Sequence, residues 1–152
     1  MATTKPGPEA VLTITRTFAA PREKVFRAWT EAEALKQWWA AGEGFTTPIA
    51  EVDLRVGGHY RLGMKPPDKD VVYVVGGVYR EIQPPARLVY TWAWEGSDWP
   101  ETVVTVEFRD RGGSTEVVLT HEPFVDAKVR AEHLAGWTGC LDRLAHVVEG
   151  SR

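Results

Sequence analysis

Residues 126–149 read DAKVRAEHLAGWTGCLDRLAHVVE, and the spacing of their apolar side chains predicts one long helix. Asp126 is of a type that caps helix N-termini, so the helix is expected to occupy most of residues 127–149. At about 1.5 Å per residue, such a helix is roughly 30 Å long or more and can cross a whole sheet. A stripe at helical spacing would face that sheet: Val129, His133, Trp137, Cys140, Leu141, Leu144 and Val148.

Two short helices are expected near the N-terminus, after a first strand at residues 11–18. Pro21 suits the first turn of the first helix, because proline is tolerated there. The second helix is predicted to begin at the T-x-x-E capping box that runs from Thr30 to Glu33. It is expected to end at Gly42 and Gly44.

The central part of the chain predicts strands. Runs of β-branched and aromatic residues bounded by turn residues lie at 49–56, 60–64, 71–82, 88–94, 103–109 and 115–120. Gly76-Gly77 predicts a bulge or sharp bend in the third of these. The element order predicts an α+β fold, a curved antiparallel sheet of about six or seven strands with the long helix over it. Residues 1–10 are expected to be flexible, and 11–150 to form a single domain.

Composition excludes several classes of partner. The net charge is −3 without a Lys/Arg cluster, which argues against nucleic acid and anionic membranes. No apolar run approaches the roughly 20 residues of a membrane span. The single cysteine, Cys140, rules out an intrachain disulfide, and the N-terminus lacks the apolar core of a signal peptide. A cytoplasmic location is therefore expected.

Seven tryptophans are the unusual feature of the composition. Tyr90, Trp92 and Trp94 share one face of their strand, because strand side chains alternate. They either line a pocket for an apolar ligand or fill the core beneath the long helix. His133 lies on the apolar helix stripe, and His121 ends the last strand. Each is interpreted either as a polar group for a ligand or as a satisfied core residue.

Five further residues lead to structural expectations: Gly136, Glu51, Asp53, Arg55 and Cys140. Gly136 lies inside a helix, where glycine costs about 1 kcal/mol relative to alanine, so close approach to a strand or room for a ligand is expected to compensate. Asp53 and Arg55 are predicted to share a strand face with Glu51, as a solvated stripe of ion pairs rather than as groups that enter a cavity. Cys140 is predicted to behave as a small buried hydrophobe.

The chain opens with Leu12-Thr13-Ile14-Thr15-Arg16-Thr17-Phe18 followed by Ala20-Pro21-x-x-x-Val25-Phe26-x-Ala28-Trp29. This opening resembles that of the SRPBCC (START-like) superfamily. Further motifs follow in order: Trp38-Trp39, Asp53-Leu54-Arg55-x-Gly57-Gly58, Leu88-Val89-Tyr90-Thr91-Trp92, Leu119-Thr120-His121 and His133-x-x-Gly136-Trp137-x-x-x-Leu141-x-x-Leu144. Together they resemble the branch that is named after the activator of the heat-shock-protein-90 ATPase. The resemblance covers about residues 12–148.

The resemblance implies a helix-grip fold, like that of START domains and the birch-pollen allergen, with a hydrophobic pocket under the C-terminal helix. A nuclear-transport-factor-like cone is the alternative fold, but it usually lacks the long C-terminal helix. In the eukaryotic co-chaperone, an additional N-terminal domain makes the chaperone contacts. These 152 residues leave no room for it.

The expected function is binding of a small hydrophobic or aromatic ligand, by a monomer or homodimer. The candidate ligand-binding residues are Trp38, Tyr60, Tyr90, Trp92, Trp94, His121, His133, Gly136 and Trp137. No catalytic residue, cofactor or metal site is predicted, since H-E-x-x-H and C-x-x-C motifs are both lacking.

Two alternatives remain at this point. A cyclase or dehydratase would need polar groups such as Tyr60, Tyr90, His121 or His133 to converge on one cavity. A chaperone-associated protein of the stress response, which activates an ATPase, would instead use an exposed contact surface.

Overall fold

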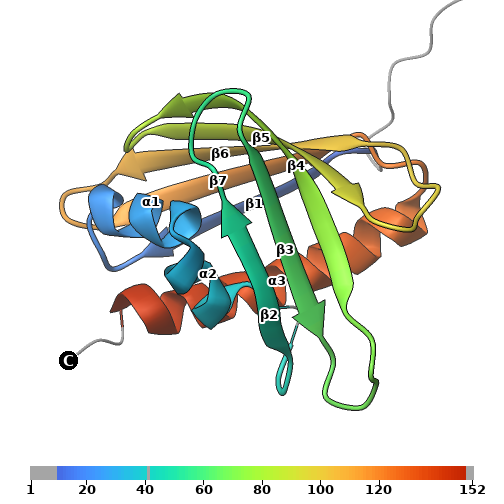
Figure 1. Cartoon of the computed structure of the whole chain (residues 1–152). Coiled ribbons are helices and arrows are strands. Elements are labelled where there is room, and N and C mark those ends of the chain that lie inside the picture. Colours follow the sequence, from blue (N-terminus) through green and yellow to red (C-terminus); the bar gives the residue numbers. More distant parts are fainter. Residues whose placement is uncertain (1–9, 41, 150–152) are drawn as a thin grey trace, which may run out of the picture.

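The computed structural model describes residues 10–40 and 42–149, and within them the elements follow the predicted order (Figure 1). The elements are β1 Leu12–Phe18, α1 Arg22–Thr30, α2 Ala32–Trp38, β2 Thr46–Val52, β3 His59–Lys65, β4 Tyr73–Gln83, β5 Arg87–Trp94, β6 Thr102–Asp110, β7 Thr115–Glu122 and α3 Ala127–Glu149. Residues 1–9 of the segment expected to be flexible lie outside the described residues. None of the described helices is long and apolar enough to span a membrane.

The strands form one antiparallel sheet in the order β1-β7-β6-β5-β4-β3-β2. Each strand from β2 onward pairs with its neighbour along the chain, whereas β1 pairs with β7 and places Leu12 opposite His121. The sheet curves around α3, and α1 and α2 lie together at one end of it (Figure 1). The predicted α+β helix-grip fold is confirmed.

The core lies on the concave face of the sheet. In β6 every second residue is buried, including Val104, Val106 and Phe108, as the two-residue period of a strand requires. Helix α1 covers this face and brings Phe26 and Trp29 into edge contact with the Phe108 ring, at centroid distances of 5.3 and 5.6 Å. Aromatic packing thus joins α1 to the middle of the sheet.

Helix α3 is buried unevenly along its length. The predicted N-cap is confirmed, because Oδ1 of Asp126 accepts a hydrogen bond from the backbone N–H of Val129 at 2.8 Å. From Trp137 onward the helix buries residues such as Trp137 and Leu144, whereas Val129 and His133 before it are only half-buried. The hollow of the fold therefore lies under the first half of α3.

Contacts with β1 and the residues beside it hold α3 across the sheet. Arg16 forms an ion pair with Asp142, and a Glu149 carboxylate oxygen accepts a hydrogen bond from the backbone N–H of Ala19 at 2.8 Å. Nε of Arg130 donates to the backbone oxygen of Val11 at 2.7 Å. These contacts are distributed from the first turn to the last turn of the helix and fix its position against β1.

The predicted capping box at Thr30 is wrong. Thr30 is the last residue of α1, and its hydroxyl donates to the backbone oxygen of Phe26 at 2.9 Å. Helix α2 begins instead after Glu31, which makes no side-chain cap. A helical Thr30 satisfies its own helix and is not free to cap the next. Helix α2 also ends at Trp38, before the predicted glycines.

The predicted position of the second strand is also wrong at its end. Strand β2 stops at Val52, because the backbone N–H of Arg55 turns back to the carbonyl oxygen of Asp53 at 2.9 Å. Gly57 follows with a φ of 87°, which favours glycine. Asp53 and Arg55 form an exposed ion pair of 2.9 Å in this turn. They therefore do not share a strand face with Glu51.

The irregularity in β4 differs from the predicted bulge at Gly76-Gly77. The register against β5 stays constant from Val75 to Tyr79 and shifts only between Tyr79 and Glu81. At Gly77 the backbone instead passes so close to Thr91 that an added Cβ would lie 2.1 Å from the Thr91 carbonyl oxygen. The glycine permits a close backbone approach, and the side chains from Val75 to Tyr79 keep their alternation.

Candidate ligand pocket

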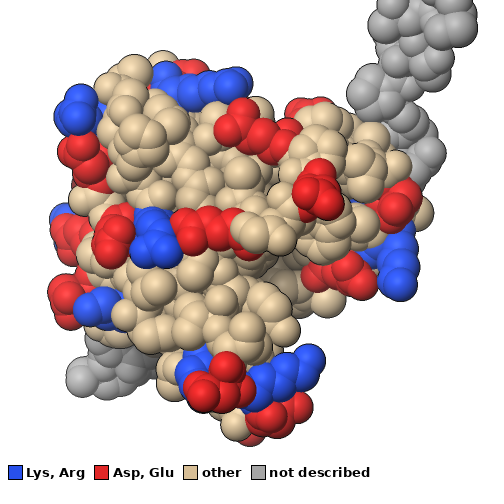
Figure 2. Space-filling model, turned by 45° about the vertical axis from the view of Figure 1, so that its right-hand side comes forward, with Lys and Arg blue, Asp and Glu red and all other residues tan. Residues whose placement is uncertain are grey.

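A pocket of about 680 Å³ lies between the first half of α3, the ends of β4 and β5, and the β3–β4 and β5–β6 loops. Five of the seven tryptophans line it: Trp39, Trp92, Trp94, Trp99 and Trp137. Other lining residues are Met64, Val71, Val72, Tyr73, Val74, Glu95, Gly96, Ser97, Glu132, His133, Gly136 and Cys140. In Figure 2 the right-hand side of Figure 1 comes forward, and acidic side chains are visible over that side.

The tryptophan rings lie against one another rather than separately. The Trp92 ring contacts those of Trp94 and Trp137, at centroid distances of 5.6 and 5.2 Å. Trp39 approaches both Trp92 and Trp94, at 6.2 and 6.4 Å. The wall is therefore a continuous aromatic surface, which neighbouring ring contacts hold in place.

A hydrogen-bonded histidine fixes one tryptophan of the wall. Nε1 of Trp94 donates to Nε2 of His133 at 2.9 Å. Since Nε2 accepts, the ring proton lies on Nδ1 and is donated to the backbone oxygen of Val129 at 2.9 Å. Burial lowers the pKa of His133, although its bond to Val129 and the nearby Glu132 act in the opposite direction. The neutral imidazole is the form that fits this arrangement.

A second histidine fixes Trp137 from behind the pocket. His121 is fully buried, and its Nδ1 accepts a hydrogen bond from Nε1 of Trp137 at 3.1 Å. Its Nε2 therefore carries the proton and lies 2.7 Å from the Thr102 hydroxyl, which in turn donates to the backbone oxygen of Trp92 at 3.3 Å. Burial, with a smaller contribution from His133, holds the pKa of His121 well below its usual value. Trp137 and Trp92 are thus positioned by one chain of hydrogen bonds.

Gly136 explains part of the empty volume. It lies on the pocket wall, and an added Cβ would meet no atom within 4 Å. Of the two explanations that the sequence allowed, close approach to a strand is therefore excluded, and open space remains.

The indole Nε1–H of Trp92 is buried and has no hydrogen-bond partner among the described residues. A hollow of about 20 Å³, bordered by Trp92 and Thr102, lies beside the main pocket. That volume is enough for one water molecule.

Comparison with known proteins identifies the family of this chain. The model of the family described as "Activator of Hsp90 ATPase homolog 1-like protein" matches residues 19–149. The chain belongs to this family. All the residues that line the pocket lie within the matched segment. The predicted branch of the START-like superfamily is therefore confirmed.

Solved structures similar to this family member share its fold over nearly the whole chain. A protein from Chromobacterium violaceum superposes with a TM-score of 0.85 and 28% identity, covering 92% of this chain and 97% of its own. The AHSA1 protein of Silicibacter pomeroyi superposes with a TM-score of 0.80 and 28% identity, covering 91% and 96%. No curated protein matches the chain.

Five of the nine predicted ligand-binding residues of this family member come together on the pocket wall: Trp92, Trp94, His133, Gly136 and Trp137. The other four are buried in the core behind it. Nε1 of Trp38 donates to the backbone oxygen of Ala28 at 2.8 Å, and the Tyr60 hydroxyl donates to that of Thr91 at 2.5 Å. The Tyr90 hydroxyl accepts from Nε1 of Trp29 at 3.1 Å, and His121 lies behind Trp137.

Sequence reasoning missed much of the wall. Trp39 immediately follows Trp38, and the adjacent pair of tryptophans was itself a signal that one of them faces a different environment. Val71, Val72 and Trp99 lie in loops, where there is no period from which a face can be assigned. The signal available in the sequence was a tryptophan, Trp99, within the otherwise polar loop at residues 95–101.

Cys140 borders the pocket of this family member but is buried and chemically quiet. Its Sγ donates to the backbone oxygen of Ala40 at 3.2 Å, and burial raises the pKa of the thiol to about 12. The prediction of a small buried hydrophobe is consistent with these contacts. Among the described residues, no group of three His, Cys, Asp or Glu side chains could hold a metal ion.

Proposed function

We propose that this protein binds one small hydrophobic or aromatic molecule in the tryptophan-walled pocket. The observation that carries the proposal is the concentration of five tryptophans around a space of about 680 Å³. Ligand pockets typically measure ~300–1,000 Å³ and combine apolar walls with a few polar groups. The START-like superfamily, to which the family belongs, is known for hydrophobic ligands.

The fixed orientation of two tryptophans on the pocket wall supports a role in ligand binding. Trp94 and Trp137 are held by hydrogen bonds to His133 and His121 before any ligand arrives. A ligand that contacts these rings therefore loses less free energy to side-chain ordering than one that contacts mobile side chains. Gly136 adds room at a position where alanine would be the better helix former.

The enzymatic alternative is less well supported by this geometry. Of the four polar side chains that it would need to converge, His133 lies on the pocket wall, while Tyr60, Tyr90 and His121 bond elsewhere in the core. The chaperone-associated alternative rests on the family description. For location we propose the cytoplasm, because a lone buried Cys140 is typical of a reducing compartment.

A neutral fluorescent probe tests the proposal. N-phenylnaphthylamine, an apolar aromatic amine whose emission rises in apolar surroundings, should bind the purified protein saturably at one site. Gly136→Leu, which projects a side chain into the pocket, should weaken probe binding and reduce the rise in emission. Ala135→Leu adds the same side chain at the exposed neighbouring position and should leave binding unchanged. Equal binding by both variants would contradict the proposal.

A further inference from the structure

The charged side chains on the pocket wall are both acidic. Among the described residues that line the pocket, Glu95 and Glu132 carry charge, and none is lysine or arginine. The two carboxylates differ in their surroundings, and that difference determines which one could meet a charged ligand.

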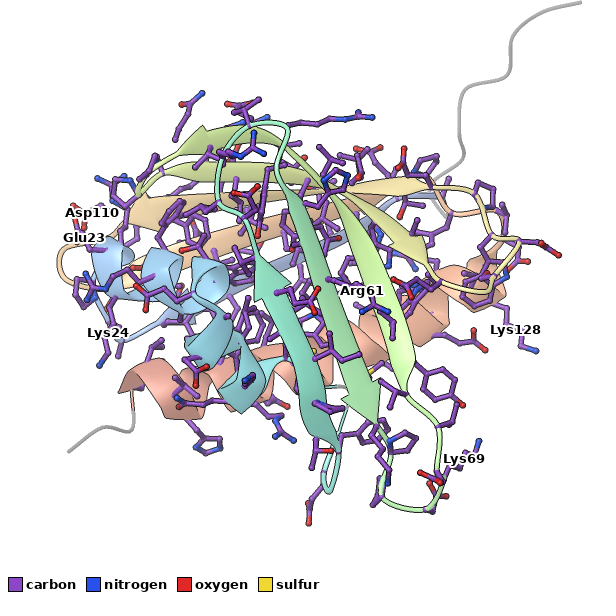
Figure 3. The ribbon with its side chains drawn as sticks, viewed as in Figure 1. Glu23, Lys24, Arg61, Lys69, Asp110 and Lys128 are labelled. Carbon is purple, nitrogen blue, oxygen red and sulfur yellow. The ribbon has the colours of Figure 1, made fainter. Side chains whose placement is uncertain are left out.

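The negative charge of Glu95 is already paired with a cationic side chain. Both of its carboxylate oxygens accept hydrogen bonds from the guanidinium of Arg61, at 2.6 and 2.9 Å. Such a two-point pair uses the planar donors of arginine fully. Figure 3 shows Arg61 on β3, and Arg61 itself is not part of the pocket wall.

Glu132 forms no ion pair with any described residue. The basic residue one helical turn before it is Lys128, whose side chain projects outward from the start of α3 in Figure 3. Lys69 lies at the tip of the β3–β4 loop and also points outward. The carboxylate of Glu132 is therefore available at the mouth of the pocket.

His133 does not supply a positive charge to this wall. Its Nε2 accepts the Trp94 indole proton, so a second ring proton there would oppose two donors. A carboxylate ligand would leave water for a pocket without a cationic partner, which is costly.

The tryptophan rings favour the opposite charge. The face of an indole is electron-rich and attracts cations, most strongly when the cation is shielded from water. The rings of Trp39, Trp92, Trp94 and Trp137 each lie within 5.2 to 6.4 Å of another ring of this group, so a cation in the pocket would meet a wall of several indoles rather than a single ring. Groups of aromatic side chains are a known recognition mode for organic ammonium ions, and Glu132 adds one negative charge to the lining of this pocket.

We infer that the pocket selects organic cations: small molecules with an apolar or aromatic body and one ammonium group that lies near Glu132. This inference rests on the proposed function, because it specifies the ligand class of the same pocket. It predicts that, among ligands of one shape, the cation binds best and the carboxylate worst.

Three probes with a common biphenyl body separate the two proposals: biphenylmethylammonium, biphenylmethanol and biphenylcarboxylate, titrated by calorimetry at low salt. The ammonium should bind about tenfold more tightly than the alcohol, which corresponds to a typical cation–π contribution together with a partly screened carboxylate. The carboxylate should bind more weakly than the alcohol. Equal or stronger binding of the alcohol or the carboxylate would overturn the inference and leave the proposed function standing. Failure of all three to bind would overturn both.

A matched pair of variants locates the charge. Glu132→Gln should reduce the ammonium preference severalfold and leave the affinity for biphenylmethanol unchanged. Glu23→Gln removes one carboxylate from an exposed position at the start of α1, at the opposite end of the molecule from Lys128 in Figure 3. It should change neither affinity. An ammonium preference that is unaltered in Glu132→Gln would contradict the assigned role of this carboxylate.

Discussion

Nε1 of Trp94 on β5 donates a hydrogen bond to Nε2 of His133 on α3 across 2.9 Å. The bond joins the sheet to the first half of the helix, where packing is sparse. It requires an imidazole without a proton on Nε2. Protonation of His133 would therefore replace an attractive contact with two opposed donors.

Stability should consequently depend on pH. Burial lowers the pKa of both His121 and His133 in the folded protein, so the unfolded chain binds these protons more readily. The contribution of each neutral histidine to the free energy of unfolding is fully present above about pH 6.5, the pKa of histidine in the unfolded chain. This contribution decreases as the pH falls below that value. Each histidine should contribute up to about 1.4 kcal/mol per pH unit. Urea unfolding between about pH 8 and pH 5 measures the slope.

Carboxylates also titrate toward acid, so the histidine contribution is isolated by His133→Phe. This variant should show a shallower loss of stability between about pH 6.5 and pH 5 than the parent. An identical slope in both proteins would mean that His133 is not held neutral by the fold.

Gly77→Ala should be strongly destabilising. A Cβ at this position would lie 2.1 Å from the backbone oxygen of Thr91, and neither backbone can move without disturbing β4 or β5. We expect a loss of about 3 kcal/mol or more, at the upper end of single-site effects. Gly136→Ala is the control, because its Cβ meets nothing within 4 Å and the change should stabilise α3 by about 1 kcal/mol. Similar changes in the thermal stability of Gly77→Ala and Gly136→Ala would contradict the predicted clash at Gly77.

Cys140 should resist alkylation in the folded protein. Its thiol is buried, and its pKa is raised to about 12, so almost no thiolate is present at neutral pH. Iodoacetamide labelling followed by mass spectrometry should be far slower than in urea. Labelling of the native protein at the rate of the unfolded chain would show that the site is open.

Trp99→Ala should separate ligand binding from stability. Trp99 is 45% exposed, yet it lines the pocket, so its removal should weaken N-phenylnaphthylamine binding. The free energy of unfolding should change by less than about 1 kcal/mol, as for other largely exposed positions. Trp38→Ala, in contrast, removes a fully buried ring and should cost about 3–5 kcal/mol. Loss of stability without loss of binding in Trp99→Ala would contradict the pocket assignment.

The fold was predictable because its signals are periodic. The α3 stripe and the alternation of Tyr90, Trp92 and Trp94 identify which face of each element turns inward, and the structure agrees on both. Periodicity does not indicate which residues of the inward face pack in the core and which border the pocket. Tyr90 and Trp94 point the same way, yet Tyr90 lies under α1 against Trp29, whereas Trp94 reaches the open end.

The pocket was only partly predictable for the same reason. His133, Gly136 and Trp137 follow from the helix stripe, since one helix face covers the hollow. Val71 and Trp99 come from loops whose path depends on tertiary contacts rather than on local sequence. The wall therefore combines residues that a pattern indicates with residues that only the assembled fold brings near.

The indole N–H resonances provide the most direct test of the pocket. A titration of ¹⁵N-labelled protein with biphenylmethanol, with each signal assigned by a Trp→Phe variant, reports on all seven tryptophans at once. Saturable shifts are expected for the wall residues, with Trp94 and Trp137 foremost, while Trp29 and Trp38 in the core should barely move. Shifts that are absent, or that are as large for Trp29 and Trp38 as for the wall, would contradict a ligand site beneath α3.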